Sequence, residues 1–252
     1  MFIVPRITES FVDSVMSDIE WQRYDDLYQH QDGELNADYV GFDQVAELKI
    51  FEEEPLRKNE RQNKIAEIYS SNGSFGDLID IDFTNVESDI RLKLEKEISK
   101  TLKTPIKKAS GQLKVTSKHH SISGDRVLIA VNNEFSSLNF DEFIRLMEER
   151  CKRDSTTITH LVAITVEYHQ GAFDTRIDAE VKVRKIHAEH DWEFEEHFRK
   201  SFFNRFEACM TQILVAPEMI ESQLPEVKAI KFERNGVTFV KAVEEIPDSR
   251  FE

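Results

Sequence analysis

The sequence predicts an α/β protein with a mixed central β-sheet flanked by helices. Two observations lead to this prediction. Amphipathic helical patterns and short strand patterns follow one another along the whole chain, instead of forming separate blocks. The 252 residues are 40% hydrophobic and include 18 phenylalanines, which is enough apolar surface for one sizeable core. We therefore expect a single domain over residues 1–252.

The start of the chain predicts a helix followed by a β-hairpin. Thr8 is a candidate N-cap, and the apolar residues after it recur at helical spacing. ADYVGF (residues 37–42) and QVAELKIF (44–51) then predict two short strands with little between them. Residues 52–86 give only a partly helical pattern and then a loop.

The middle of the chain predicts two helices and a buried strand. Residues 88–104 carry Ile90, Leu94, Ile98 and Leu102 on one stripe, and Pro105 is expected to end or restart this helix. Residues 106–119 predict a second helix, although Gly111 weakens the pattern. DRVLIAVN (125–132) is almost wholly apolar, which is typical of a strand buried on both faces.

The remainder, residues 136–252, is expected to be a strand-helix extension. Residues 137–153 have a strong helical pattern. Residues 160–168 and 176–186 alternate between apolar and polar side chains, as in an antiparallel pair. Residues 192–213 predict another amphipathic helix. The rest is acidic, with one candidate strand in GVTFVKAV.

Several classes of protein do not fit the composition. No apolar run is long enough for a transmembrane helix, and the N-terminus lacks the pattern of a secretory signal. Two cysteines, Cys151 and Cys209, are too few for a disulfide scaffold or a structural zinc site. The histidines, including His187 and His190, lack zinc-binding spacing, so we expect them to have surface or loop roles. A cytoplasmic protein with no membrane partner fits best.

The charge is unevenly distributed. A net charge of −15 argues against a protein that coats nucleic acid non-specifically. From Arg91 to Lys118, however, the chain carries nine lysines or arginines against two glutamates. This basic stripe is suited to facing a polyanion, but a solvated helix face has the same composition.

Asp38, Glu47 and Lys49 interrupt the two apolar strand patterns of the hairpin at residues 36–51. Successive side chains of a strand point to opposite faces, so Glu47 and Lys49 share one face. Asp38 lies nine residues before Glu47, and a hairpin of that length would return it to the same place. Two carboxylates, phosphate oxygens and water can complete the octahedral coordination of Mg²⁺. A lysine beside the attacking water could offset charge that develops on the phosphate.

NADYVGFDQVAELKIF resembles the active-site hairpin of the PD-(D/E)XK nuclease superfamily, which includes type II restriction enzymes and Holliday-junction resolvases. In that family an aspartate opens one strand, and (Asp/Glu)-X-Lys lies within the next. Asp38, Glu47 and Lys49 match these positions, while Ala37 stands where the family name has proline. The resemblance implies a restriction-endonuclease-like core over about residues 5–135. It also implies that the two carboxylates bind Mg²⁺ or Mn²⁺ and that the lysine assists the attacking water.

The resemblance implies further site residues. A later helix often lends a glutamine or a basic residue to the site, and Gln112 and Lys114 resemble that element. Glu9 or Glu20 in the first predicted helix could add a metal ligand, or could lie on a solvated helix face. The residues expected to contact nucleic acid come from the basic stripe: Lys107, Lys108, Lys114 and Lys118.

An E-X-K triplet is common in charged strands, and the chain contains a second one, Glu180 and Lys182. Asp174 precedes Glu180 by only six residues, too few for a full hairpin. The strand over residues 176–186 also carries many other charges, as a solvated face does. We therefore favour the first triplet, with ordinary strand charges as the alternative reading of it.

The leading hypothesis is a metal-dependent nuclease that hydrolyses DNA, and the resemblance suggests a role in defence against foreign DNA. One such centre cuts one strand, so double-strand cleavage would require a homodimer or a second binding event. The acidic net charge favours restricted access of the substrate, which would fit a protein partner that controls the activity. The alternative is a non-catalytic module of the same fold that contacts a protein partner.

Overall fold

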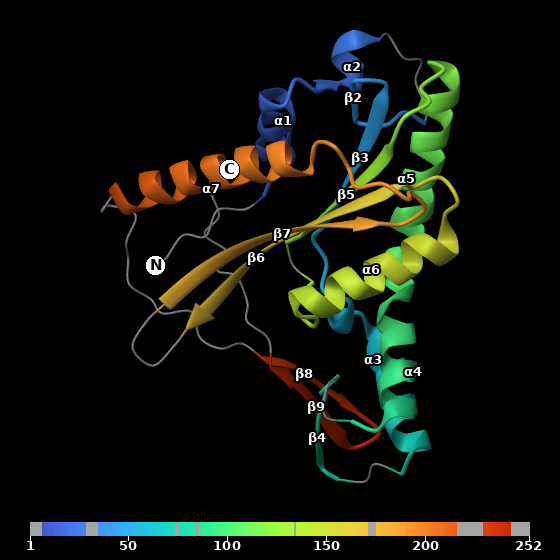
Figure 1. The fold of residues 1–252 in the computed structure, drawn as a ribbon. Coiled ribbons are helices and arrows are strands. Elements are labelled where there is room, and N and C mark those ends of the chain that lie inside the picture. Colours follow the sequence, from blue (N-terminus) through green and yellow to red (C-terminus); the bar gives the residue numbers. More distant parts are fainter. Residues whose placement is uncertain are drawn as a thin grey trace.

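The computed structural model describes residues 7–28, 35–73, 76–83, 86–133, 135–170, 175–215 and 229–242. Its centre is a six-stranded mixed sheet, which Figure 1 shows with helices packed around it. In spatial order the strands are β1 (Gln22–Arg23), β2 (Tyr39–Gly41), β3 (Gln44–Phe51), β5 (Arg126–Asn132), β6 (His160–Gln170) and β7 (Thr175–Lys185). The predicted α/β class, with a mixed sheet flanked by helices, is confirmed.

The sheet combines a hairpin with parallel strands. β2 and β3 pair antiparallel, and the two residues between them, Phe42 and Asp43, both have positive φ. Two-residue turns of this kind match the twist of the paired strands. β3, β5 and β6 run parallel, and β7 returns antiparallel to β6. The predicted hairpin, buried strand and antiparallel pair are therefore confirmed.

Two apolar cores lie on opposite faces of the sheet. One is closed by α5 (Lys100–His119) and α6 (Phe140–Asp154), the other by α1 (Glu9–Asp18) and α7 (Glu195–Val215). α1 begins after Thr8, whose hydroxyl accepts a hydrogen bond from the backbone NH of Phe11. A short helix, α2 (Tyr24–Leu27), follows β1. The helices predicted around residues 8–19, 137–153 and 192–213 are therefore present.

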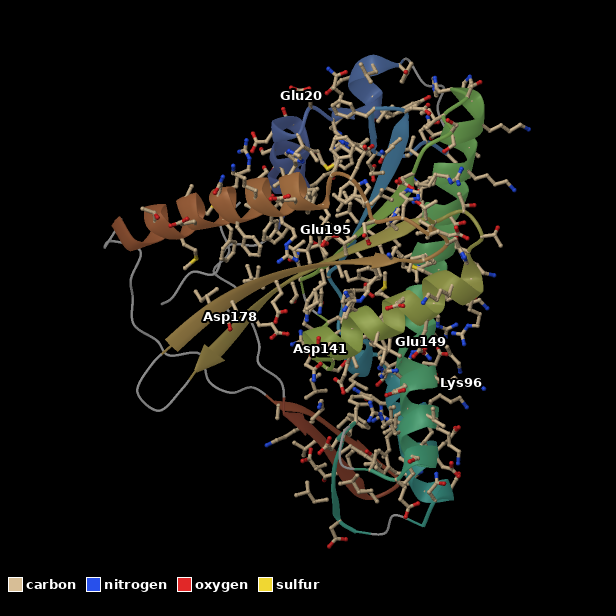
Figure 2. The ribbon with its side chains drawn as sticks, viewed as in Figure 1. Glu20, Lys96, Asp141, Glu149, Asp178 and Glu195 are labelled. Atoms are coloured by element: carbon tan, nitrogen blue, oxygen red, sulfur yellow. The ribbon has the colours of Figure 1, made fainter. Side chains whose placement is uncertain are left out.

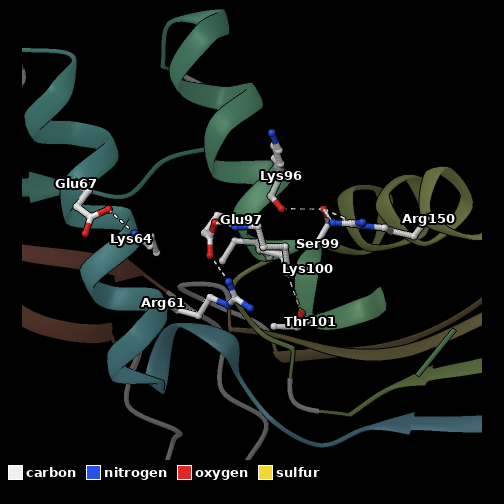
Figure 3. A network of polar contacts seen from close by, with 10 residues as sticks. Arg61, Lys64, Glu67, Lys96, Glu97, Ser99, Lys100, Thr101 and Arg150 are labelled. Atoms are coloured by element: carbon white, nitrogen blue, oxygen red, sulfur yellow. Dashed lines mark hydrogen bonds and ion pairs between the residues drawn. The ribbon is translucent and has the colours of Figure 1, made fainter. Parts of the chain in front are cut away.

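The break in the lysine-rich helical segment lies at Ser99 and not at Pro105. α4 (Ser88–Ile98) ends at Ser99, and α5 then continues through Pro105. Figure 3 shows the contacts at this interruption: Arg150 of α6 donates to the Ser99 hydroxyl, and Glu97 pairs with Arg61. A proline removes one helical hydrogen bond, yet α5 contains Pro105 without a break.

A second, three-stranded sheet occupies sequence that gave no clear pattern. Its order is β4 (Leu78–Asp80), β9 (Val237–Ala242) and β8 (Ala229–Arg234). It packs with α3 (Asn59–Ser71), which follows a 3-10 turn at Pro55–Arg57. The strand predicted in GVTFVKAV is present, whereas β4 and β8 were not predicted. Within the described residues no helix has the length and hydropathy to cross a bilayer.

Candidate functional site

The hairpin register places the two predicted carboxylates opposite each other. Tyr39 pairs with Ala46, and Val40 with Val45, so one step further Asp38 falls opposite Glu47. Asp38 Oδ2 accepts a hydrogen bond of 2.7 Å from the backbone NH of Leu48. This bond orients the carboxylate at the mouth of the hairpin and leaves Oδ1 for another partner.

Lys49 and Gln112 complete the group. Lys49 Nζ forms an ion pair with Glu47 Oε1 and donates to Gln112 Oε1 over 3.2 Å. The Gln112 amide nitrogen donates to the carbonyl of Asn36 at 2.8 Å, just before the hairpin. The structure therefore brings together all four residues expected in the active site, from the hairpin and from α5.

The site concentrates negative charge where water is excluded. Glu47 has 0% of its surface exposed, and burial raises the pKa of its carboxyl to about 8. The neighbouring Asp38 carboxylate contributes to this raised pKa, while Lys49 opposes it. Burial also raises the pKa of Asp38, against the opposing effects of the Leu48 NH and Lys49. One lysine thus faces one fully buried and one half-buried carboxyl group.

One oxygen of the pair is well suited to a metal ion. Glu47 Oε2 is buried and has no hydrogen-bond partner within the described parts of the chain. When both carboxyl groups are ionised they can only accept hydrogen bonds, so Asp38 cannot then satisfy this oxygen. A hard divalent cation held between the two carboxylates would satisfy it, since Mg²⁺ and Mn²⁺ prefer oxygen ligands. The residues present therefore fit such an ion.

The two glutamates of the first helix differ in position. Glu9 raises the pKa of Asp38, which places its charge near the site, but it forms an ion pair with Arg23 at 2.5 Å. Glu20 lies just after α1, at the outer end of that helix, and is exposed (Figure 2). Only Glu9 is therefore close enough to influence the site.

The predicted nucleic-acid lysines do not share one direction. Lys107, Lys108, Lys114 and Lys118 are all exposed on α5. At about 100° per residue, Lys108 lies within about 40° of Gln112 around the helix, whereas the other three lie about 120–160° away. Lys96 of α4 likewise points outward (Figure 2). Only Lys108 is therefore turned toward the side of the candidate site.

The second E-X-K triplet has the contacts of an ordinary surface strand. Lys182 lies on β7, which ends the six-stranded sheet, and pairs with Asp141 at 2.8 Å and with Glu180 at 3.2 Å. The Glu180 side chain is 40% exposed. Asp174 falls outside the described residues. This triplet therefore lacks the buried carboxylate that distinguishes the first.

The sequence reasoning missed a second polar group. Asp125, His160 and His190 present ligand atoms within 4.8 Å of one another and could hold a metal ion. His160 is fully buried in β6, so a surface or loop role is wrong for this histidine. The only sequence signal for this group of three residues is that Asp125 and His160 stand at the starts of two buried strands. Which strands become neighbours is a property of the fold.

Comparison of the chain with protein-family models, with curated proteins and with solved structures gives no significant match. The function must therefore be argued from the geometry of the chain itself.

Proposed function

We propose that this protein is a metal-dependent nuclease that hydrolyses DNA phosphodiester bonds at the Asp38–Glu47–Lys49 site. The observation that carries the proposal is a pair of opposed carboxyl groups beside a lysine, Glu47 fully buried and Asp38 half-buried. One oxygen, Glu47 Oε2, has no hydrogen-bond partner among the residues that the structure describes. The resemblance of the hairpin to PD-(D/E)XK nucleases supports the same reading. Asp38 and Glu47 would hold Mg²⁺ or Mn²⁺.

The residues have distinct roles in this proposal. When bound, the divalent ion would supply the positive charge that activates water and offsets charge on the phosphate. The Lys49 ammonium orients the attacking water and stabilises negative charge as it develops. Gln112 is a positioning residue, because its amide links the lysine to the backbone of Asn36. The Leu48 NH fixes the direction of the Asp38 carboxylate.

The decisive experiment compares wild type with Lys49→Ala on supercoiled, linear and single-stranded DNA, and on RNA, with Mg²⁺, Mn²⁺ or EDTA. We expect metal-dependent cleavage of DNA by wild type and a loss of at least about 100-fold in Lys49→Ala. Lys182→Ala is the matched control, because it removes the lysine of the other E-X-K triplet. It should retain full activity.

Two results would argue against catalysis. If wild type neither cleaves nucleic acid nor binds Mn²⁺ in calorimetry, Asp38, Glu47 and Lys49 are ordinary strand charges. If it binds Mn²⁺ at this hairpin but cleaves none of the substrates, the non-catalytic module that contacts a protein partner becomes the better explanation. Cleavage that survives Lys49→Ala would move the active site elsewhere.

A further inference from the structure

A group outside the proposed nuclease site lies at the opposite face of the central sheet. Asp125 immediately precedes β5, His160 begins β6, and His190 lies in the segment between β7 and α7. His160 pairs in register with Val127, which packs in the core closed by α1 and α7. Glu47, in contrast, projects toward α5. The two groups are therefore separate sites.

The hydrogen bonds of His160 determine the state of its ring. Its Nε2 lies 3.0 Å from the backbone carbonyl of His190, and a carbonyl only accepts, so Nε2 carries a hydrogen. In the neutral ring, Nδ1 then carries no hydrogen and presents a lone pair. The hydroxyl of Thr159, 3.1 Å from Nδ1, also lies 3.2 Å from the carbonyl of Arg126 and donates there. Nδ1 is left facing the Asp125 carboxylate.

This leaves one pair of electron-pair donors facing each other inside the protein: Nδ1 of neutral His160 and Asp125 Oδ1, 3.3 Å apart. Nε2 of His190 lies 3.0 Å from Asp125 Oδ2, where one tautomer of its ring donates a hydrogen bond and the other offers a lone pair to a metal ion. His160 is 0% exposed and Asp125 is 6% exposed, so water does not separate them. Two lone pairs at this spacing repel unless a proton or a metal cation lies between them, and the two cases differ in whether the group binds a metal ion.

We propose that Asp125, His160 and His190 bind a divalent transition-metal ion of the Zn²⁺ class. Two imidazoles with one carboxylate suit Zn²⁺, whereas Mg²⁺ prefers oxygen ligands alone. Ligands at about 2.0–2.1 Å from a tetrahedral ion lie about 3.3 Å apart, close to the two separations between Asp125 and the histidines, and all three ligand atoms lie within 4.8 Å of one another. The bond from His160 Nε2 to a carbonyl is the outer contact that orients metal-binding histidines. The His190 side chain is 66% exposed, which leaves the fourth position open to water.

The test is a Zn²⁺ titration of metal-stripped protein by calorimetry, with Co²⁺ absorption as a report of coordination geometry. The same titration is made with Glu47→Gln, which lacks one proposed ligand of the hairpin site. Zn²⁺ binding is measured separately from DNA cleavage, so a failure of the proposed nuclease activity does not affect this test. We expect one equivalent of Zn²⁺ in wild type and in Glu47→Gln, with intense visible absorption by four-coordinate Co²⁺. His190→Ala should weaken Zn²⁺ binding at least 10-fold and abolish that absorption. His190 is exposed, so the variant should fold.

His197→Ala is the matched control, because it removes an exposed histidine of α7 outside the group. It should bind Zn²⁺ as wild type does. The proposal is overturned if wild type binds no Zn²⁺, or if His190→Ala binds it with unchanged affinity. Zn²⁺ binding that is lost in Glu47→Gln and kept in His190→Ala would also overturn it, since the ion would then occupy the hairpin.

Discussion

Glu47 is a fully buried carboxyl group in the middle of a central strand. Ordinary strands keep such groups at the surface, because ionising them away from water is costly. Here Lys49 offsets part of the cost, and the Asp38 carboxylate adds to it. Without a metal ion, the pKa of about 8 means that Glu47 holds a proton at neutral pH. The same atoms that would hold a cation are therefore a source of instability when it is absent.

This raised pKa predicts a pH dependence of stability in EDTA. The folded carboxyl holds its proton up to about pH 8, whereas the unfolded one loses it near 4.5. The folded state thus binds more protons in this window, so the free energy of unfolding falls as pH rises through it. We expect wild type to lose about 2–5 kcal/mol between these limits, at roughly 1.4 kcal/mol per pKa unit. Urea denaturation at several pH values measures it.

Glu47→Gln should flatten this dependence, because an amide does not titrate. Glu180→Gln, in the exposed triplet, should leave it unchanged. A slope in Glu47→Gln equal to that of wild type would show that other groups cause the effect.

α5 is the element that joins the candidate site to the basic stripe. Its inner face contributes Gln112 to the hairpin group, and its apolar residues close one of the two cores. Its outer face carries most of the lysines. A helix presents side chains in all directions around its axis, so a surplus of charge in the sequence does not by itself form one binding surface. Only lysines on the Gln112 side could contact a nucleic acid that also reaches Glu47.

Replacing Lys108 should therefore affect DNA binding more than replacing Lys114. With catalysis blocked by Lys49→Ala, we expect Lys108→Ala to weaken binding several-fold and to lower the salt slope by about one. Lys114→Ala removes the same charge from the far side of α5 and should change little. Fluorescence anisotropy at several salt concentrations distinguishes them. Equal effects would mean that the whole stripe binds, and that DNA need not lie across the hairpin.

At the scale of the whole molecule, one chain holds one hairpin site, and the second sheet joins distant parts of the sequence. β4 lies between the hairpin and α5 in sequence, whereas β8 and β9 come from residues 229–242. Phe232 and Phe239 of this sheet pack with Tyr69 of α3 in the same core as α5 and α6. The stretch of about residues 5–135 that the family resemblance covers therefore contributes only β4 to the second sheet. The Asp125 group lies on the other face of the central sheet, so it shares no residue with the hairpin site.

A single centre predicts the first product of cleavage. One chain cuts one strand, so supercoiled DNA should become open-circular before it becomes linear. We expect nicked product at low protein concentration, followed by linear product only at later times. Agarose gels over a time course at several protein concentrations measure this. Linear product that forms directly, and more readily as concentration rises, would indicate a homodimer with two centres.

The sequence by itself determined the hairpin and the residues that meet in it. Strand alternation and a two-residue turn are local properties, so Asp38, Glu47 and Lys49 could be placed on one face from their spacing. Gln112 came from the family resemblance and not from spacing. The main helices were also predictable, because their apolar periodicity is continuous.

Only the tertiary structure decided the features that depend on distant segments. The interruption between α4 and α5 falls at Ser99, where Arg150 and Arg61 contact the junction, and no local pattern encodes those contacts. β4 has only three residues, and β8, although as long as β9, lies in sequence without a clear strand pattern; both pair with β9. Asp125, His160 and His190 become neighbours because β5 and β6 run parallel and the segment before α7 returns to their starts. Local sequence sets which way a side chain points, whereas packing sets what it meets.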